Sequence, residues 1–145
     1  MKKLGYNNII VAVDGSEASS KAFKKAIQIA KNNDSRLIIT NVVDSRTFAT
    51  VEAYDQTLAN RAESHAKELI DEHVEEAKNA GLSNLIRCIE YGSPKVIIAK
   101  DIAKTFDADL IICGATGLNA VERFLIGSVS ESITRYATCD VLVVR

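Results

Sequence analysis

Two kinds of apolar pattern alternate along the whole chain, and this alternation restricts the possible folds more than any other feature. Five short runs rich in β-branched residues are typical of buried strands. They cover residues 9–13, 37–43, 85–90, 110–113 and 141–144. Between them come segments in which apolar residues recur every three or four positions, as on one face of a helix. These cover residues 16–31, 58–77, 94–106 and 128–136.

Strands that alternate with helices in this way predict a doubly wound α/β domain with a largely parallel sheet. The 145 residues fit one domain, and a hydrophobic content of 47% is enough for a core on both faces of a sheet. We therefore predict a single domain over residues 1–145, with a five-stranded parallel sheet and four helices in a Rossmann-like arrangement. If the first strand is central, the chain winds outward through strands two and three and returns, which gives the order 3-2-1-4-5.

This strand order predicts where a ligand would bind. In open α/β sheets, ligands bind beyond the carboxyl ends of the strands, where the winding reverses. The reversal is expected between the first and fourth strands. Asp14 follows the first of these strands and Gly114 follows the fourth. The acid and the glycine are therefore expected to face each other across one crevice.

The segment after the fourth strand has the composition of a phosphate-binding loop. Gly114 and Gly117 are followed, after nine further residues, by Gly127 and Ser128 at the start of the last predicted helix. Glycine lets the backbone approach an anion closely, and the first turn of a helix offers N–H groups and a partial positive charge. The hydroxyls of Ser128 and Ser130 would add donors. The simpler alternative is that the glycines shape a turn and Ser128 is an ordinary helix cap.

The spacing of these residues, G-x2-G-x9-G-[ST], resembles the nucleotide-binding signature of the universal stress protein family. Residues 9–16 are similar to the opening strand of that family with its terminal aspartate, and residues 139–144 are similar to its last strand. The likeness extends over essentially the whole chain. It implies a homodimeric, cytoplasmic regulatory protein of the stress response that binds ATP or AMP, with Mg²⁺ as an accompanying ion.

The resemblance also implies which residues would contact the nucleotide. Ala12 and Val13 would line the adenine pocket, and Val42 would read the adenine edge with its backbone. Asp14 would lie near the sugar and phosphates, where it would bind a ribose hydroxyl or Mg²⁺; a turn before Gly15 is its structural alternative. The other implied contacts belong to the loop over the ribose and phosphates and to the turn that opens the last helix. They are Cys113, Gly114, Gly117, Gly127, Ser128, Val129 and Ser130.

Two positions depart from the family pattern, and neither belongs to the glycine signature. Asn41 stands where histidine is common, so we expect it to alter the wall of the pocket near the base. Asp140 stands where a proline often precedes the last strand, so it bears on how that strand begins.

The last apolar run, residues 141–144, is expected at an edge of the sheet without a cover. An apolar edge strand invites pairing with another chain. Pairing with a second copy about a two-fold axis is the simplest solution. We therefore predict a homodimer held partly by Val141 and Val143, as the resemblance also implies.

Composition and spacing argue against several other classes of protein. A net charge of −1 gives no basic surplus for nucleic acid, and no apolar run is long enough for a membrane span. Cys88, Cys113 and Cys139 form no C-x-x-C pair, so they indicate neither zinc nor a redox dithiol and fit a reducing cytoplasm. His65 and His73 lack the i, i+4 spacing of a zinc pair. No metal site made by protein side chains is expected.

No catalytic residues are predicted, because the chain has no nucleophile motif such as G-x-S-x-G. Two alternatives to a nucleotide-binding regulator stay open. One is a slow ATPase or autophosphorylating enzyme, with Asp14 and Arg123 as the candidate residues for the chemistry and Ser128 or Ser130 as the acceptor. The other is a dimeric interaction module that needs no nucleotide. The irregular stretch at residues 44–57 has the length of a lid or binding loop.

Overall fold

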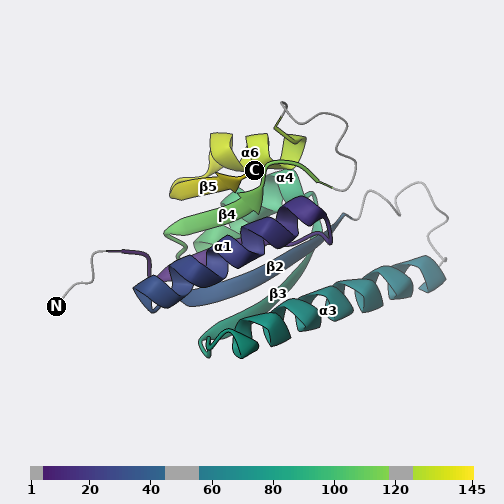
Figure 1. The fold of residues 1–145 in the computed structure, drawn as a ribbon. Coiled ribbons are helices and arrows are strands. Elements are labelled where there is room, and N and C mark those ends of the chain that lie inside the picture. Colours follow the sequence, from purple (N-terminus) through teal and green to yellow (C-terminus); the bar gives the residue numbers. More distant parts are fainter. Residues whose placement is uncertain (1–4, 45–55, 118–125) are drawn as a thin grey trace.

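The computed structural model describes residues 5–44, 56–117 and 126–145, and strands and helices alternate along them as the sequence predicts (Figure 1). The strands are β1 (Asn8–Ala12), β2 (Arg36–Asp44), β3 (Leu85–Gly92), β4 (Leu110–Gly114) and β5 (Asp140–Val144). The helices are α1 (Glu17–Asn33), α3 (Gln56–Asn79), α6 (Ser128–Tyr136) and a continuous segment of α4 (Pro94–Val96), η1 (Ile97–Ile102) and α5 (Ala103–Thr105). Arg123 and most of the irregular stretch at residues 44–57 lie outside the described residues.

The five strands form one parallel sheet in the order β3-β2-β1-β4-β5, which confirms the predicted order. β1 is central, because Ile10 pairs with Ile38 of β2 on one side and with Ile111 of β4 on the other. The chain therefore leaves β1 toward β2 and β3 and later returns past it to β4 and β5. The winding reverses between β1 and β4.

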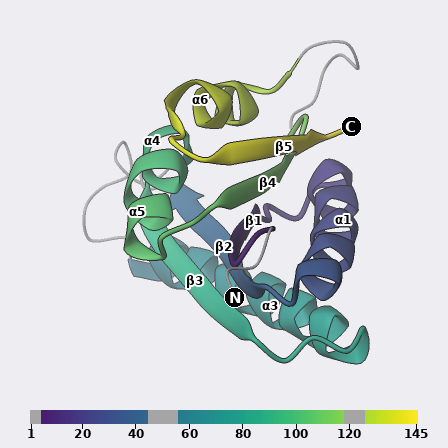
Figure 2. The same ribbon diagram turned by 90° about the vertical axis from the view of Figure 1, so that its left-hand side faces the viewer.

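Helices cover both faces of the sheet (Figure 2), and each face has its own hydrophobic core. α1 and α3 cover one face, where Ile9 and Phe23 are fully buried. The segment α4–η1–α5 and α6 cover the other face, where Ile10 and Ile133 are fully buried. Successive side chains of a strand point to opposite faces, so a strand between two cores must be apolar throughout. This explains why the run at residues 9–13 shows no polar alternation.

α1 begins directly after Ser16, at the predicted start, and ends at Asn33, two residues beyond the predicted end. Ser16 is the N-cap, and its hydroxyl oxygen accepts a hydrogen bond from the Ser19 N–H at 3.1 Å. Asp34 closes the helix in the left-handed conformation, with φ of 53°. Ala22 and Ala26 are fully buried, and their small side chains let α1 lie close to the sheet.

The helical segment after β3 differs from a regular α-helix. Pro94 stands in its first turn, at the predicted start of the helix, and Ser93 before it makes no side-chain capping hydrogen bond. The turns at Ile97–Ile102 are π-helical, which a periodicity of 3.6 residues does not reveal. Ile98 and Ile102 are nevertheless buried as the apolar pattern predicts.

The last strand starts at the position where the family pattern is broken. Asp140 is the first residue of β5, and its carboxylate accepts a hydrogen bond from the Tyr6 hydroxyl at 2.7 Å. The aspartate thus joins the end of the sheet to the segment that precedes β1. Among the described helices, none has both the length and the apolar character needed to cross a bilayer.

Candidate functional site

The carboxyl ends of β1 and β4 lie next to each other, and the segments that follow them meet at this edge of the sheet. β1 ends at Ala12, and β4 ends at Gly114, which pairs with Val144 of β5. The Ala115 N–H donates to the Val144 carbonyl (2.8 Å), and the Gly127 N–H donates to the Ala115 carbonyl (2.6 Å). The loop after β4 is thus fastened both to β5 and to the start of α6.

Asp14 is held at this edge by the start of α1. Its Oδ1 accepts a hydrogen bond from the Ser16 N–H (2.9 Å), and its own N–H donates to the Ser19 hydroxyl (3.3 Å). Its Oδ2 faces the loop after β4, because a Cβ added to Gly117 would lie 3.3 Å from that oxygen. The acid and the glycine loop therefore meet across the switch point, and Gly117 is the residue that faces the carboxylate.

Position 114 needs a glycine for a packing reason that the sequence did not reveal. A Cβ added there would lie 2.8 Å from the backbone carbon of Ala18 and 2.9 Å from its carbonyl oxygen. These are rigid backbone atoms of α1, so no side-chain movement could make room. The missing side chain of Gly114 lets α1 pack on the end of β4. The resemblance had assigned this glycine to the loop over the ribose and phosphates.

The start of α6 is open toward the same edge. Gly127 is its N-cap, with an extended backbone (φ −62°, ψ 156°) and no side-chain capping hydrogen bond. A Cβ on Gly127 would lie 3.4 Å from both the Ala115 oxygen and the Thr116 Cα, so the loop packs tightly there. Ser128 and Val129 follow in the first turn, where N–H groups have no partner within the helix. Ser128 is exposed, and Val129 is half-buried against the core.

Ser130 differs from its expected use as a side-chain donor to phosphate. It is buried, and its hydroxyl donates to the Gly114 carbonyl at 2.6 Å. A hydroxyl has only one proton to donate, so that proton is already engaged. The side chain of Ser130 joins α6 to the end of β4, and only its backbone N–H belongs to the open first turn.

Cys113 lies on the opposite side of β4 from α1. Its side chain is buried in the core under α6, and this burial raises the pKa of the thiol to about 11, while the neighbouring Ser130 hydroxyl acts in the opposite direction. The thiol is therefore neutral at ordinary pH and unsuited to act as a nucleophile. Cys88 is also buried, within the apolar run at residues 85–90.

β2 continues past the end of β1 and borders the same edge of the sheet, next to β1. Val42 is half-buried and pairs with Glu90 of β3, while the β1–β2 ladder ends with Ala12 and Thr40. Asn41 is one of the two departures from the family pattern. Its Nδ2 donates a hydrogen bond to the Val13 carbonyl at 2.7 Å. The end of β1 is therefore tied to β2 by a side chain.

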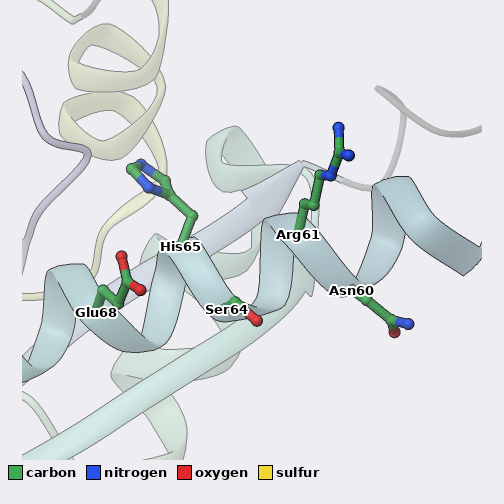
Figure 3. A pocket seen from close by; sticks show the side chains of 5 residues that line it. All are labelled: Asn60, Arg61, Ser64, His65 and Glu68. Atoms are coloured by element: carbon green, nitrogen blue, oxygen red, sulfur yellow. The ribbon is translucent and has the colours of Figure 1, made fainter.

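A cavity of about 370 Å³ lies elsewhere, along the first half of α3 (Figure 3). Its described lining consists of polar residues from successive turns of this one helix, with Arg61 and His65 projecting on the same side. The full set is Asn60, Arg61, Ser64, His65 and Glu68. It contains none of the predicted site residues. Within the described residues, no group of three or more His, Cys, Asp or Glu side chains could hold a metal ion.

Comparisons with known proteins agree with the observed fold. The sequence profile of the universal stress protein family matches residues 5–145. A putative universal stress protein of Staphylococcus haemolyticus is 51% identical over 142 residues, which cover 98% of this chain and 86% of that protein. The structure of the universal stress protein UspA from Lactobacillus plantarum has a TM-score of 0.87 at 35% identity, over 98% of this chain and 99% of that chain. A universal stress protein solved in complex with cAMP has a TM-score of 0.75 at 26% identity, over 98% of both chains.

Proposed function

This chain belongs to the universal stress protein family, and we propose that it is a cytoplasmic regulatory protein that binds an adenine nucleotide, ATP or AMP, between β1, β4 and α6. One observation carries the proposal. The uncapped start of α6 is bonded to the loop after β4, and that loop in turn faces the Asp14 carboxylate. A site for phosphate and a site for a sugar hydroxyl are thus joined at the switch point of the sheet.

The phosphates would bind the backbone N–H groups of Ser128, Val129 and Ser130. A helix N-terminus carries a partial positive charge of about half a unit, and backbone donors hold an anion without a buried cation. The N-terminus of α1 is less suited to bind phosphate than that of α6, because the side chain of Ser16 already caps it. α6 has glycine at the same position, so a ligand would not have to displace a side-chain oxygen.

Asp14 would bind the ribose. Its Oδ1 is engaged by the Ser16 N–H, and Oδ2 is directed at the loop that closes the site. A bare carboxylate beside phosphate would repel it, so Oδ2 would accept from a ribose hydroxyl or contact a Mg²⁺ that the nucleotide carries. One carboxylate together with phosphate oxygens is a usual Mg²⁺ environment.

The base would lie against the carboxyl ends of β1 and β2. Ala12 and Val42 are half-buried and apolar, and both belong to the face of the sheet that α6 covers. The relative solved with cAMP supports an adenine nucleotide as the class of ligand, because that ligand combines an adenine base with a phosphate. A few charge-assisted hydrogen bonds with base burial correspond to an affinity on the order of micromolar.

We also propose that two copies associate through β5. This strand is at the edge of the sheet, and it pairs only with β4 among the described strands. Its residues Val141 and Val143 are only half-buried. Light scattering at tens of micromolar should give the mass of a dimer, and Val143→Lys should shift the mass toward a monomer. A monomer in the unmodified protein would reject this part of the proposal.

Isothermal titration calorimetry with ATP, AMP and GTP tests the proposed ligand. We expect binding of at least one adenine nucleotide with a Kd on the order of micromolar, and weaker binding of GTP. Gly117→Leu should weaken this binding, while Asn79→Leu, at an exposed position in the last turn of α3, should not. No heat with any adenine nucleotide up to millimolar concentration would remove the proposal.

A further inference from the structure

The backbone hydrogen-bond ladder between β1 and β2 ends one bond earlier than the register of the two strands would allow. Within it, even-numbered residues of β2 direct their N–H groups to β1, since the Arg36 N–H donates to the Asn7 carbonyl and the Leu37 N–H donates to the Asn84 carbonyl before β3. The Val13 N–H still reaches the Thr40 carbonyl at 2.9 Å. The next bond in a parallel ladder would run from the Val42 N–H to the Val13 carbonyl.

That bond is replaced by a side chain. In the described segment over residues 5–44, the last pair of the ladder is Ala12 with Thr40, so Val13 and Asn41 are not paired as strand residues. The Val13 carbonyl accepts from Asn41 Nδ2 instead, at 2.7 Å. Because β2 continues in register with β3 as far as Asp44, the backbone orientation of Val42 is unchanged. Its N–H and C=O both point to the side that β1 has left.

We propose that Asn41 is a positioning residue that ends the β1–β2 ladder at Val13 and thereby keeps the Val42 N–H and C=O available to read the edge of a 6-aminopurine. This inference rests on the nucleotide-binding function proposed above. A donor and an acceptor on one residue match adenine, which offers the acceptor N1 beside the 6-amino donor. They oppose hypoxanthine and guanine, whose N1–H and O6 present the reverse order.

The side chain of Asn41 suits this task because it satisfies the Val13 carbonyl without extending the sheet. An unsatisfied carbonyl at this half-buried edge would favour closing the ladder onto Val42. Asn41→Asp keeps the shape but replaces the donor with a carboxylate oxygen, which the Val13 carbonyl repels. Asn41→Leu keeps the approximate volume and removes both polar atoms. Asn79→Leu, on the exposed end of α3, is the matched control.

Amide hydrogen exchange of the free protein tests the structural part without any ligand. We expect the Val42 amide to exchange at least about tenfold faster than the Thr40 amide, which lies inside the ladder. In Asn41→Leu the Val42 amide should become slower, because its N–H can then reach the Val13 carbonyl. A Val42 amide that is already as protected as that of Thr40 in the unmodified protein would overturn the proposal.

The ratio of the affinities for ATP and inosine triphosphate tests the reading of the base. We expect the unmodified protein and Asn79→Leu to prefer ATP by about tenfold or more, and both Asn41 variants to reduce this preference to about threefold or less. A general loss of structure in the Asn41 variants would weaken the binding of both ligands equally and leave the ratio of the affinities unchanged. An unchanged ratio would therefore overturn the proposal. If the unmodified protein binds neither ligand, the proposed function fails, and the exchange rates of Val42 still decide whether Asn41 ends the ladder.

Discussion

The carboxylate of Asp14 lies against the bare Cα of Gly117: a Cβ built on that glycine would stand 3.3 Å from Asp14 Oδ2. The two residues follow β1 and β4, the strands between which the sheet reverses its winding. Asp14 Oδ1 also accepts a hydrogen bond from the Ser16 N–H, which sets the orientation of the carboxylate. Any side chain at Gly117 therefore crowds the Asp14 carboxylate, at the edge of the sheet where the nucleotide is proposed to bind.

Gly117→Leu should lower the affinity for ATP by at least about tenfold, because the new side chain would displace the Asp14 carboxylate and cover the edge where the nucleotide is proposed to bind. The backbone of Gly117 is not in the left-handed region, so the substitution adds no backbone strain. Calorimetry gives the affinity, and light scattering should show that the oligomeric state persists. Unchanged ATP binding in this variant would mean that the ligand does not bind beside these two residues.

Gly114→Ala and Gly117→Ala should differ in stability although each adds one methyl group. At Gly114 the methyl meets backbone atoms of Ala18 at 2.8–2.9 Å, and we expect a loss of about 1–3 kcal/mol in the free energy of unfolding. At Gly117 it meets only the end of a carboxylate at 3.3 Å, so the loss should be below about 1 kcal/mol. Urea denaturation at one protein concentration measures both. Equal losses would contradict the packing role of Gly114.

Ser130→Ala should destabilise the fold more than Ser128→Ala. The Ser130 hydroxyl donates to the Gly114 carbonyl at 2.6 Å in a buried position, and its removal leaves that carbonyl without this partner. We expect a cost of about 1–3 kcal/mol, whereas exposed Ser128 should cost little. Thermal unfolding of the two variants compares them directly. A larger effect at Ser128 would show that α6 is not held through Ser130.

The stability of the protein should depend on Tyr6 at alkaline pH. The hydrogen bond to the Asp140 carboxylate raises the pKa of Tyr6 above its usual 10.0, and partial burial adds to the effect. Because the folded state keeps the phenol proton to higher pH than the unfolded chain, this contribution is complete below pH 10 and is lost as pH rises through the raised pKa. Urea midpoints between pH 8 and about pH 11.5 should therefore fall more steeply for the unmodified protein than for Tyr6→Phe.

Tyr136→Phe is the control for this pH dependence. Its ring is 48% exposed and lies under the Lys100 ammonium at 4.8 Å, with no carboxylate partner in the described structure. The variant should lose stability at alkaline pH as the unmodified protein does. If Tyr6→Phe loses stability at alkaline pH as steeply as the unmodified protein, the hydrogen bond to Asp140 contributes nothing to the pH dependence.

The sheet order could be predicted from the sequence because it follows from local patterns and one topological rule. Each apolar run is long enough for one buried strand, and the Asp14-Gly15 and Gly114 ends mark where strands stop. Parallel connections then leave few arrangements. The meeting of Asp14 with the glycine loop followed from that order alone.

The roles of single residues could not be predicted in the same way, because they depend on neighbours distant in sequence. The sequence does not show that α1 would press Ala18 against Gly114, nor that Ser130 would donate to the strand rather than to a ligand. The bond from Asn41 to Val13 likewise needs the register of β1 and β2. The π-helical turns at Ile97–Ile102 keep the apolar stripe of the helix intact. The apolar pattern of the sequence therefore does not distinguish them from α-helical turns.

The most direct test of the central claim is a titration of ¹⁵N-labelled protein with ATP, followed by the backbone amide resonances. We predict that the largest shifts will fall on Gly117, Ser128, Val129 and Ser130. The amides of Arg61 and His65, beside the cavity on α3, should stay in place. Shifts confined to that cavity, or none up to millimolar ATP, would contradict the account.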